Sequence, residues 1–135
     1  MTSQLSRLAK PVPPKYVAQV QSGGGKADFV SHAVITEILL AVVGPFDFHV
    51  TQIVTDKDGA VTGCLATLTC EVDGRPTSIT EVGDTTGQEG SEGGALKNAS
   101  SDALKRCAMR LGLGLHLWSK PGMYFLHDQL EKAEA

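Results

Sequence analysis

The sequence predicts an α+β domain in which a three-stranded antiparallel meander packs against helices. Between residues 60 and 72, apolar and polar residues alternate as they do in a half-buried strand. The dipeptide Asp-Gly occurs at residues 58–59 and 73–74, and between apolar runs it is the strongest short-range signal for a β-hairpin. Segments with helical periodicity precede and follow these strands, an order typical of helices on one face of an antiparallel sheet.

Composition and charge set the broad class of the protein. The 135 residues suffice for one compact domain, and 41% hydrophobic and 20% charged residues are typical of a soluble protein. The longest apolar run, residues 38–44, is too short to span a bilayer, and residues 1–10 lack the apolar core of a signal peptide. We therefore expect a cytoplasmic protein that does not interact with membranes.

Residues 1–14 predict a flexible N-terminal arm, followed by a single domain over residues 15–135. The arm contains three of the six prolines, which favour a linker with little regular structure. Residues 16–20 predict a short edge strand, which the glycine-rich segment 22–26 interrupts.

The first helix is predicted over residues 27–44. Asp28 or Ser31 can cap its start, and Gly44 with Pro45 ends it. The segment is apolar around most of its circumference, so we expect the helix to be mostly covered by other parts of the protein.

The three strands are predicted over residues 46–55, 60–72 and 75–83. On the second strand, one face carries apolar side chains and the other carries threonines and Glu71. The glycine-rich and acidic segment 84–94 that follows is typical of a mobile surface loop.

The second long helix is predicted over residues 95–113, with Gly112 and Gly114 at its end. Its predicted apolar stripe comprises Leu96, Ala99, Ala103, Leu104, Cys107, Ala108 and Leu111. Residues 122–135 predict a short terminal helix.

No pattern in the chain is typical of an enzyme. The segment Gly23–Lys26 lacks two features of a phosphate-binding P-loop, because Val20 replaces the first glycine and Ala27 replaces the Ser or Thr. The four histidines are scattered, and the acidic residues form no evident acid–base pair. The chain contains no CxxC pair, and its three cysteines are expected to be buried, reduced thiols; they are Cys64, Cys70 and Cys107. We expect no enzymatic activity, no cofactor and no metal.

The basic residues of the second long helix are the strongest functional signal. Lys105, Arg106 and Arg110 border its apolar stripe, and Lys97 stands two turns earlier, in a chain whose net charge is −3. Such residues either form a solvated helix face, which the helix dipole favours near a C-terminus, or line a phosphate-binding groove. Spacing alone leaves both interpretations open.

The segment "SSDALKRCAMRLGLG", residues 100–114, resembles the signature helix of the Rad52 family of single-strand annealing proteins. Asp102, Leu104, Lys105, Arg106 and Gly112 match its pattern. The segments at residues 29–48 and 79–87 are similar to other parts of the family in the same order. The likeness covers about residues 28–118.

The resemblance implies a Rad52-type fold that assembles into rings, for example undecamer-like rings, or into open helical arcs. Such an assembly binds single-stranded DNA by its backbone and leaves the bases outward, so that complementary strands can anneal without ATP, metal or another cofactor. It also implies a bacterial or phage-infected host cell, and a recombinase or single-strand binding protein as a further partner. Because aromatic residues make up only 5% of the chain, we do not expect broad base stacking.

The resemblance also assigns DNA-binding residues. They are, in order of expectation, Lys105, Arg106, Arg110, Lys97, Lys26 and His32. An arginine that the family often has in its first helix is replaced by Val34, so His32 or Lys26 would have to supply that contact. The acidic residues expected outside the groove are Glu81, Asp84, Glu89 and Glu92.

Two alternatives belong to other functional classes. A double-stranded-RNA-binding module also packs a meander on helices and presents a basic helix end. An oligomeric scaffold without a nucleic-acid role would instead pair the basic residues with the acidic loop of a neighbouring subunit.

Overall fold

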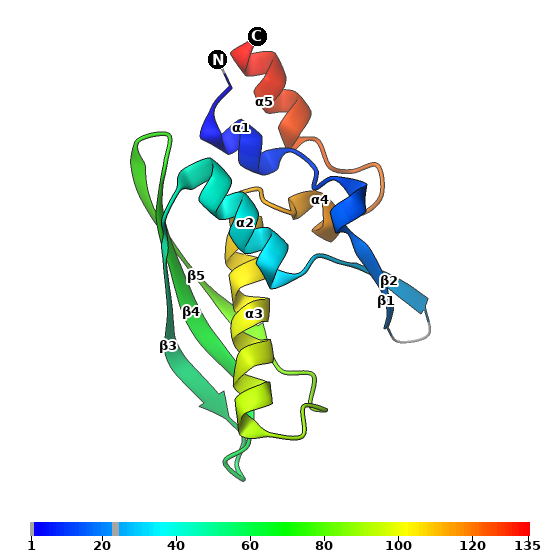
Figure 1. The fold of residues 1–135 in the computed structure, drawn as a ribbon, viewed down its shortest axis with the longest axis vertical. Coiled ribbons are helices and arrows are strands. Elements are labelled where there is room, and N and C mark those ends of the chain that lie inside the picture. Colours follow the sequence, from blue (N-terminus) through cyan, green and yellow to red (C-terminus); the bar gives the residue numbers. More distant parts are fainter. Residues whose placement is uncertain (1, 23–24) are drawn as a thin grey trace.

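The computed structural model describes residues 2–22 and 25–135 and has the predicted α+β architecture, with a long helix lying along a three-stranded sheet (Figure 1). The smaller helices and a separate β-hairpin gather beside and above one end of the long helix. In chain order the elements are α1 (Gln4–Ala9), the 3-10 helix η1 (Pro14–Tyr16), β1 (Ala18–Ser22), β2 (Gly25–Phe29), α2 (His32–Val43), β3 (Asp47–Thr55), β4 (Val61–Val72), β5 (Arg75–Asp84), α3 (Glu92–Arg110), α4 (Leu115–Trp118) and α5 (Leu126–Glu134).

The antiparallel meander is confirmed, with strand order β3-β4-β5 and β4 in the centre. Both hairpins turn at the Asp-Gly pairs. In the second turn Asp73 and Gly74 both have positive φ angles, 50° and 78°, as a two-residue hairpin turn of the primed type requires. At the first turn Gly59 has a φ of 85°. The Asp-Gly pairs therefore fix where the two hairpins of the sheet turn.

The core lies between the sheet and α3. The buried face of β4 carries Cys64, Ala66, Leu68 and Cys70, and the buried face of α3 carries Ala95, Ala99, Ala103, Leu104, Cys107 and Ala108. A Cβ atom at Gly83 of β5 would overlap the Ala99 carbonyl oxygen and lie 2.7 Å from the Ala103 nitrogen. Small residues thus allow α3 to approach the sheet closely.

The three cysteines are buried and free, as predicted. Burial raises the pKa of each thiol above its ordinary value, which makes the reactive thiolate rarer. They therefore act as small core residues.

The predicted first helix begins later than expected, because residues 25–29 form β2 and pair with β1. The register joins Val20 to Ala27 and Ala18 to Phe29. Ser31, not Asp28, caps α2, and its hydroxyl accepts a hydrogen bond from the Val34 N–H at 3.2 Å. The predicted strand at residues 16–20 is present as β1, whereas Gly23 and Gly24 of the predicted interruption lie outside the described residues.

The expectation of an N-terminal arm without regular structure is wrong. Ser3 caps α1 by accepting a hydrogen bond from the Ser6 N–H at 3.0 Å, and the side chains of Leu8 and Val12 are buried in the main core. The Ser3 hydroxyl also bonds Glu134 of α5 at 2.9 Å, so both ends of the chain lie together (Figure 1). The prolines follow the helix instead of preventing it, a common arrangement after a helix end.

Two further expectations differ from the structure. α3 begins at Glu92, capped by Ser91, and ends at Arg110, so it lies about one turn earlier than predicted. In α2 only Ile35 and Leu39 are buried, and Leu40 is 49% exposed, so this apolar helix is not mostly covered within one chain. Among the described residues, no helix combines the length and the apolar character needed to cross a membrane.

Candidate nucleic-acid interface

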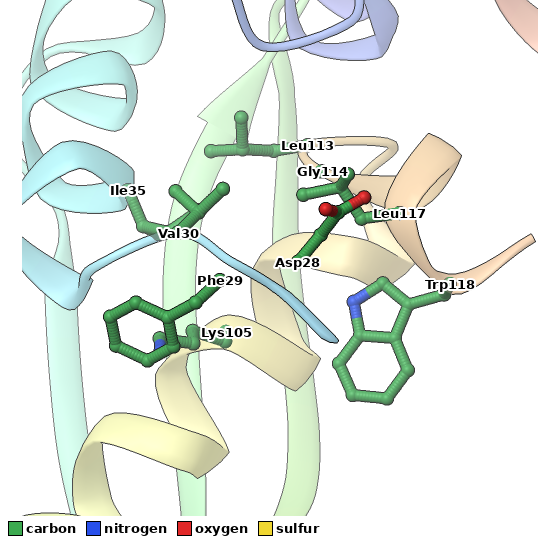
Figure 2. A pocket seen from close by; sticks show the side chains of 9 residues that line it. All are labelled: Asp28, Phe29, Val30, Ile35, Lys105, Leu113, Gly114, Leu117 and Trp118. Carbon is green, nitrogen blue, oxygen red and sulfur yellow. The ribbon is translucent and has the colours of Figure 1, made fainter. Parts of the chain in front are cut away.

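Lys105 and Arg106 lie next to each other on α3, where this helix passes the end of β2 and the short helix α4 (Figure 2). The Lys105 ammonium lies 3.8 Å from the centre of the Phe29 ring, a cation–π geometry. Burial lowers the pKa of Lys105, and the nearby Asp102 carboxylate opposes this shift. The lysine is thus held against β2 instead of extending freely into solvent.

Asp102 determines how Arg106 is held. The Arg106 Nε donates a hydrogen bond to Asp102 Oδ2 at 3.1 Å, one turn earlier on the same helix. The same oxygen accepts the backbone N–H of Asp84 at 2.9 Å, which ties the end of β5 to α3. The guanidinium carbon of Arg106 also lies 5.1 Å from the centre of the Trp118 ring. Asp102 therefore both connects β5 to α3 and orients the Arg106 guanidinium.

Arg110 has a different environment from the other two cations. Its Nε donates a hydrogen bond to Glu81 Oε2 at 2.6 Å. This bond lowers the pKa of Glu81 below its ordinary value of 4.5. Glu81, expected outside the groove, contacts one of the predicted cations, because the register of β5 places its side chain on the α3 side of the sheet, opposite Ala66. Arg110 is consequently neutralised in part by its own chain.

The remaining predicted residues belong to three different elements, α3, α2 and β2. Lys97 is exposed and lies eight residues earlier on α3, about 12 Å along the helix axis. His32 is exposed at the first turn of α2. Lys26 belongs to β2, but its side chain lies outside the described part of the structure. Val34 lines a different cavity, together with Pro13 and Tyr16.

A cavity of about 220 Å³ opens beside the two central cations. Figure 2 shows Phe29 against Lys105 on one side of it and Trp118 on the other. Its apolar lining comes from the β2–α2 connection (Val30), from α2 (Ile35), from the α3–α4 connection (Leu113) and from α4 (Leu117). The Asp28 carboxylate also lines it.

Sequence reasoning missed both aromatic residues of this cavity. Phe29 fell within the helix predicted over residues 27–44, and Trp118 was assigned no role. The one available signal was that Trp118 is the single tryptophan of the chain and closely follows the basic helix.

Two other polar groups bear on the electrostatics. Burial lowers the pKa of His116 from its ordinary value of 6.5, against a smaller opposing effect of Asp28, so this imidazole is neutral at pH 7. On α5, His127, Asp128 and Glu131 place ligand atoms within 4.8 Å of one another. Both carboxylates of this group are exposed, and His127 already pairs with Glu131 at 3.2 Å, so we assign no metal to it.

Comparison with known proteins gives one family. A model of the family described as "Rad52/22 family double-strand break repair protein" matches residues 1–124 of the 135. The match includes the whole of α3 and the cavity beside it. No curated protein matches the chain.

Proposed function

Because the chain belongs to the Rad52/22 family of double-strand break repair proteins, we propose that it binds single-stranded DNA by its backbone and anneals complementary strands without ATP. Family membership itself assigns the chain to DNA recombination and repair. The observation that carries the proposal is the juxtaposition of Lys105 and Arg106, adjacent residues of α3 at the motif positions, with Phe29 and Trp118 of one open cavity, which Lys105 also lines.

Backbone binding suits the charge distribution. Each cation that neutralises a phosphate releases counterions, which gives affinity without sequence preference and makes it depend on salt. The net charge of −3 does not oppose this mechanism, because the local field at the groove matters more than the total. Contacts confined to phosphate and sugar leave the base edges available for pairing.

The proposal includes a homo-oligomer, either a ring or a helical arc. One chain offers two adjacent cations at the motif, which alone would bind a strand weakly. Repetition of this pair along an assembly turns weak contacts into tight binding through multivalency. A recombinase or a single-strand binding protein is the further partner we propose, in the cytoplasm of a bacterial or phage-infected cell.

The first test is the fluorescence anisotropy of a labelled single-stranded oligonucleotide over a salt series, with duplex DNA and duplex RNA as competitors. We expect binding that weakens with salt and that duplexes compete poorly, followed by annealing of a complementary strand. Preferential competition by duplex RNA would favour the RNA-binding alternative. Absence of binding at low salt by folded protein would contradict the proposal and favour the scaffold.

The second test removes the two cations. Lys105→Gln with Arg106→Gln keeps most of each aliphatic stem, so it should abolish binding while the fold persists. Lys57→Gln with Lys132→Gln is the matched control, since both lysines are exposed and the change in net charge is the same. Equal binding by the two double variants would show that the site is wrong.

A further inference from the structure

We propose that each subunit stacks one nucleobase of the bound strand in the cavity between Phe29 and Trp118, an inference that rests on the proposed function. The cavity would thus supply a base-binding subsite beside the backbone-binding cations. The ligand class is a single unpaired base of single-stranded DNA, bound by its face.

The first argument is the exposure of the two rings. Phe29 is 40% exposed and Trp118 is 48% exposed, although both are large apolar side chains. They come from β2 and α4, far apart in the sequence, and line the same cavity (Figure 2). Single exposed apolar residues are ordinary, but a pair that converges on one cavity indicates a binding surface.

The second argument is that each ring has a cation beside it. Lys105 lies 3.8 Å from the ring centre of Phe29, and the guanidinium of Arg106 lies 5.1 Å from that of Trp118. A groove that places cations and aromatic rings side by side matches the repeating unit of a single strand, in which each phosphate is followed by a planar base.

The third argument is that the cavity itself suits a base better than a phosphate. Its lining is largely apolar, and the Asp28 carboxylate offsets the attraction that Lys105, which lines the same cavity, would exert on an anion. A base is neutral, and its face is apolar enough to be desolvated there. The volume of about 220 Å³ lies below the roughly 300–1,000 Å³ of pockets for drug-sized ligands, as expected for one small planar group.

Stacking is compatible with annealing. A ring that contacts the face of a base leaves its hydrogen-bonding edge free, so a stacked base can still test a complementary strand. One such site per subunit also agrees with the low aromatic content, because it needs two aromatic residues and not a continuous platform. The subsite would fix the position of the strand along the groove without reading sequence.

The single tryptophan of the 135-residue chain makes the proposal directly measurable without substitution or labelling. Two probes of equal length are compared, an oligothymidylate and an abasic phosphodiester chain that keeps the backbone charge. We expect oligothymidylate to quench the emission of Trp118, and the abasic chain to bind more weakly without quenching.

Substitutions provide an independent readout. Trp118→Ala should weaken oligothymidylate binding by roughly tenfold and leave abasic-chain binding nearly unchanged, whereas Trp118→Phe should retain most of the affinity. Phe125→Ala is the matched control, because Phe125 is also an exposed aromatic residue but does not line the cavity.

The outcomes separate this proposal from the annealing function. If oligothymidylate binds but the emission is unchanged, or changes equally with the abasic chain, the stacking subsite is wrong and backbone binding stands. If Trp118→Ala weakens the binding of both probes equally, the ring acts only by supporting Arg106, and this result also contradicts stacking. If folded protein binds neither probe, both proposals fail.

Discussion

At the scale of single residues, Asp102 shows how one side chain serves both fold and site. Its Oδ2 accepts two hydrogen bonds, one from the backbone N–H of Asp84 and one from the Arg106 guanidinium. The signature motif therefore contains an acidic residue for a physical reason, although the proposed ligand is an anion. The carboxylate fastens β5 to α3 at the point where the cations must be oriented.

Asp102→Ala is expected to lower the free energy of unfolding by about 1–2 kcal/mol, because the Asp84 N–H loses its acceptor. Asp102→Asn should have a smaller effect, since the amide oxygen can still accept one hydrogen bond. Urea unfolding of both variants measures the difference. The control is Asp47→Ala at an exposed position, and an equal effect at Asp47 would contradict the assigned role.

The ion pair between Glu81 and Arg110 predicts a dependence of stability on pH. The folded state lowers the pKa of Glu81 below 4.5, so the carboxylate contributes stability above pH 4.5 that is lost as the pH falls through the folded pKa. Glu81→Gln should therefore be destabilised by a few tenths of a kcal/mol at neutral pH, and the difference from wild type should shrink below pH 4.5. Urea unfolding at several pH values measures this. A difference that grows on acidification would contradict it.

At the scale of elements, the close approach of α3 to β5 explains the glycine at position 83. Gly83→Ala is expected to destabilise the protein by about 3 kcal/mol or more, because its Cβ would overlap the backbone of α3 at Ala99. The control is Gly93→Ala, in the first turn of α3, where an added Cβ meets nothing within 4 Å. This control should be neutral or stabilising by up to about 1 kcal/mol, because alanine is the better helix former. Thermal unfolding distinguishes the two, and similar effects would exclude the proposed overlap.

The loop between β5 and α3 is more ordered than its glycine content suggests. Glu89 accepts hydrogen bonds from the backbone N–H groups of Thr86 and Gly87 and from the side chain of Asn98. The bond from Asn98, followed by those from the backbone and the hydroxyl of Thr86, lowers the pKa of Glu89 to about 2. The segment was predicted to be a mobile acidic loop, yet one of its acidic residues organises it and connects it to α3.

At the scale of the whole molecule, β3 leaves an apolar surface uncovered. Val50 and Ile53 pair with the buried residues Ala66 and Cys64, so they point toward the α3 side of the sheet, but they are 44% and 49% exposed. A homo-oligomer, as proposed, would cover these side chains with a second copy of the chain.

Val50→Asp with Ile53→Asp is therefore expected to yield a folded protein of lower assembly state, because burying two carboxylates in an interface is costly. Sedimentation velocity measures the assembly and circular dichroism the fold. Val54→Asp is the matched control, since the register places Val54 on the opposite face of the same strand. Unchanged assembly in the double variant would exclude this surface from the interface.

The meander, the long basic helix and the buried thiols could be predicted from the sequence because their signals are local. An Asp-Gly pair determines a turn, alternation determines the faces of a strand, and periodicity determines the stripe of a helix. The N-terminal helix α1 was missed because the prolines that follow it were taken as evidence against regular structure in the whole segment. Ser3, which caps α1 and contacts the other end of the chain, was not considered.

The sequence alone determined the three-stranded meander, the long helix α3 and the positions of Lys105 and Arg106 within a recognisable motif. Only the tertiary structure decided what surrounds these cations, because Phe29 and Trp118 reach them from separate elements, and the backbone of Asp84 bonds the Asp102 carboxylate that holds Arg106. Local patterns specify how a segment folds, whereas cation–π contacts, ion pairs and a shared cavity depend on which segments pack together. The ion pair between Glu81 and Arg110 also depends on tertiary packing, since the strand register places the carboxylate against α3.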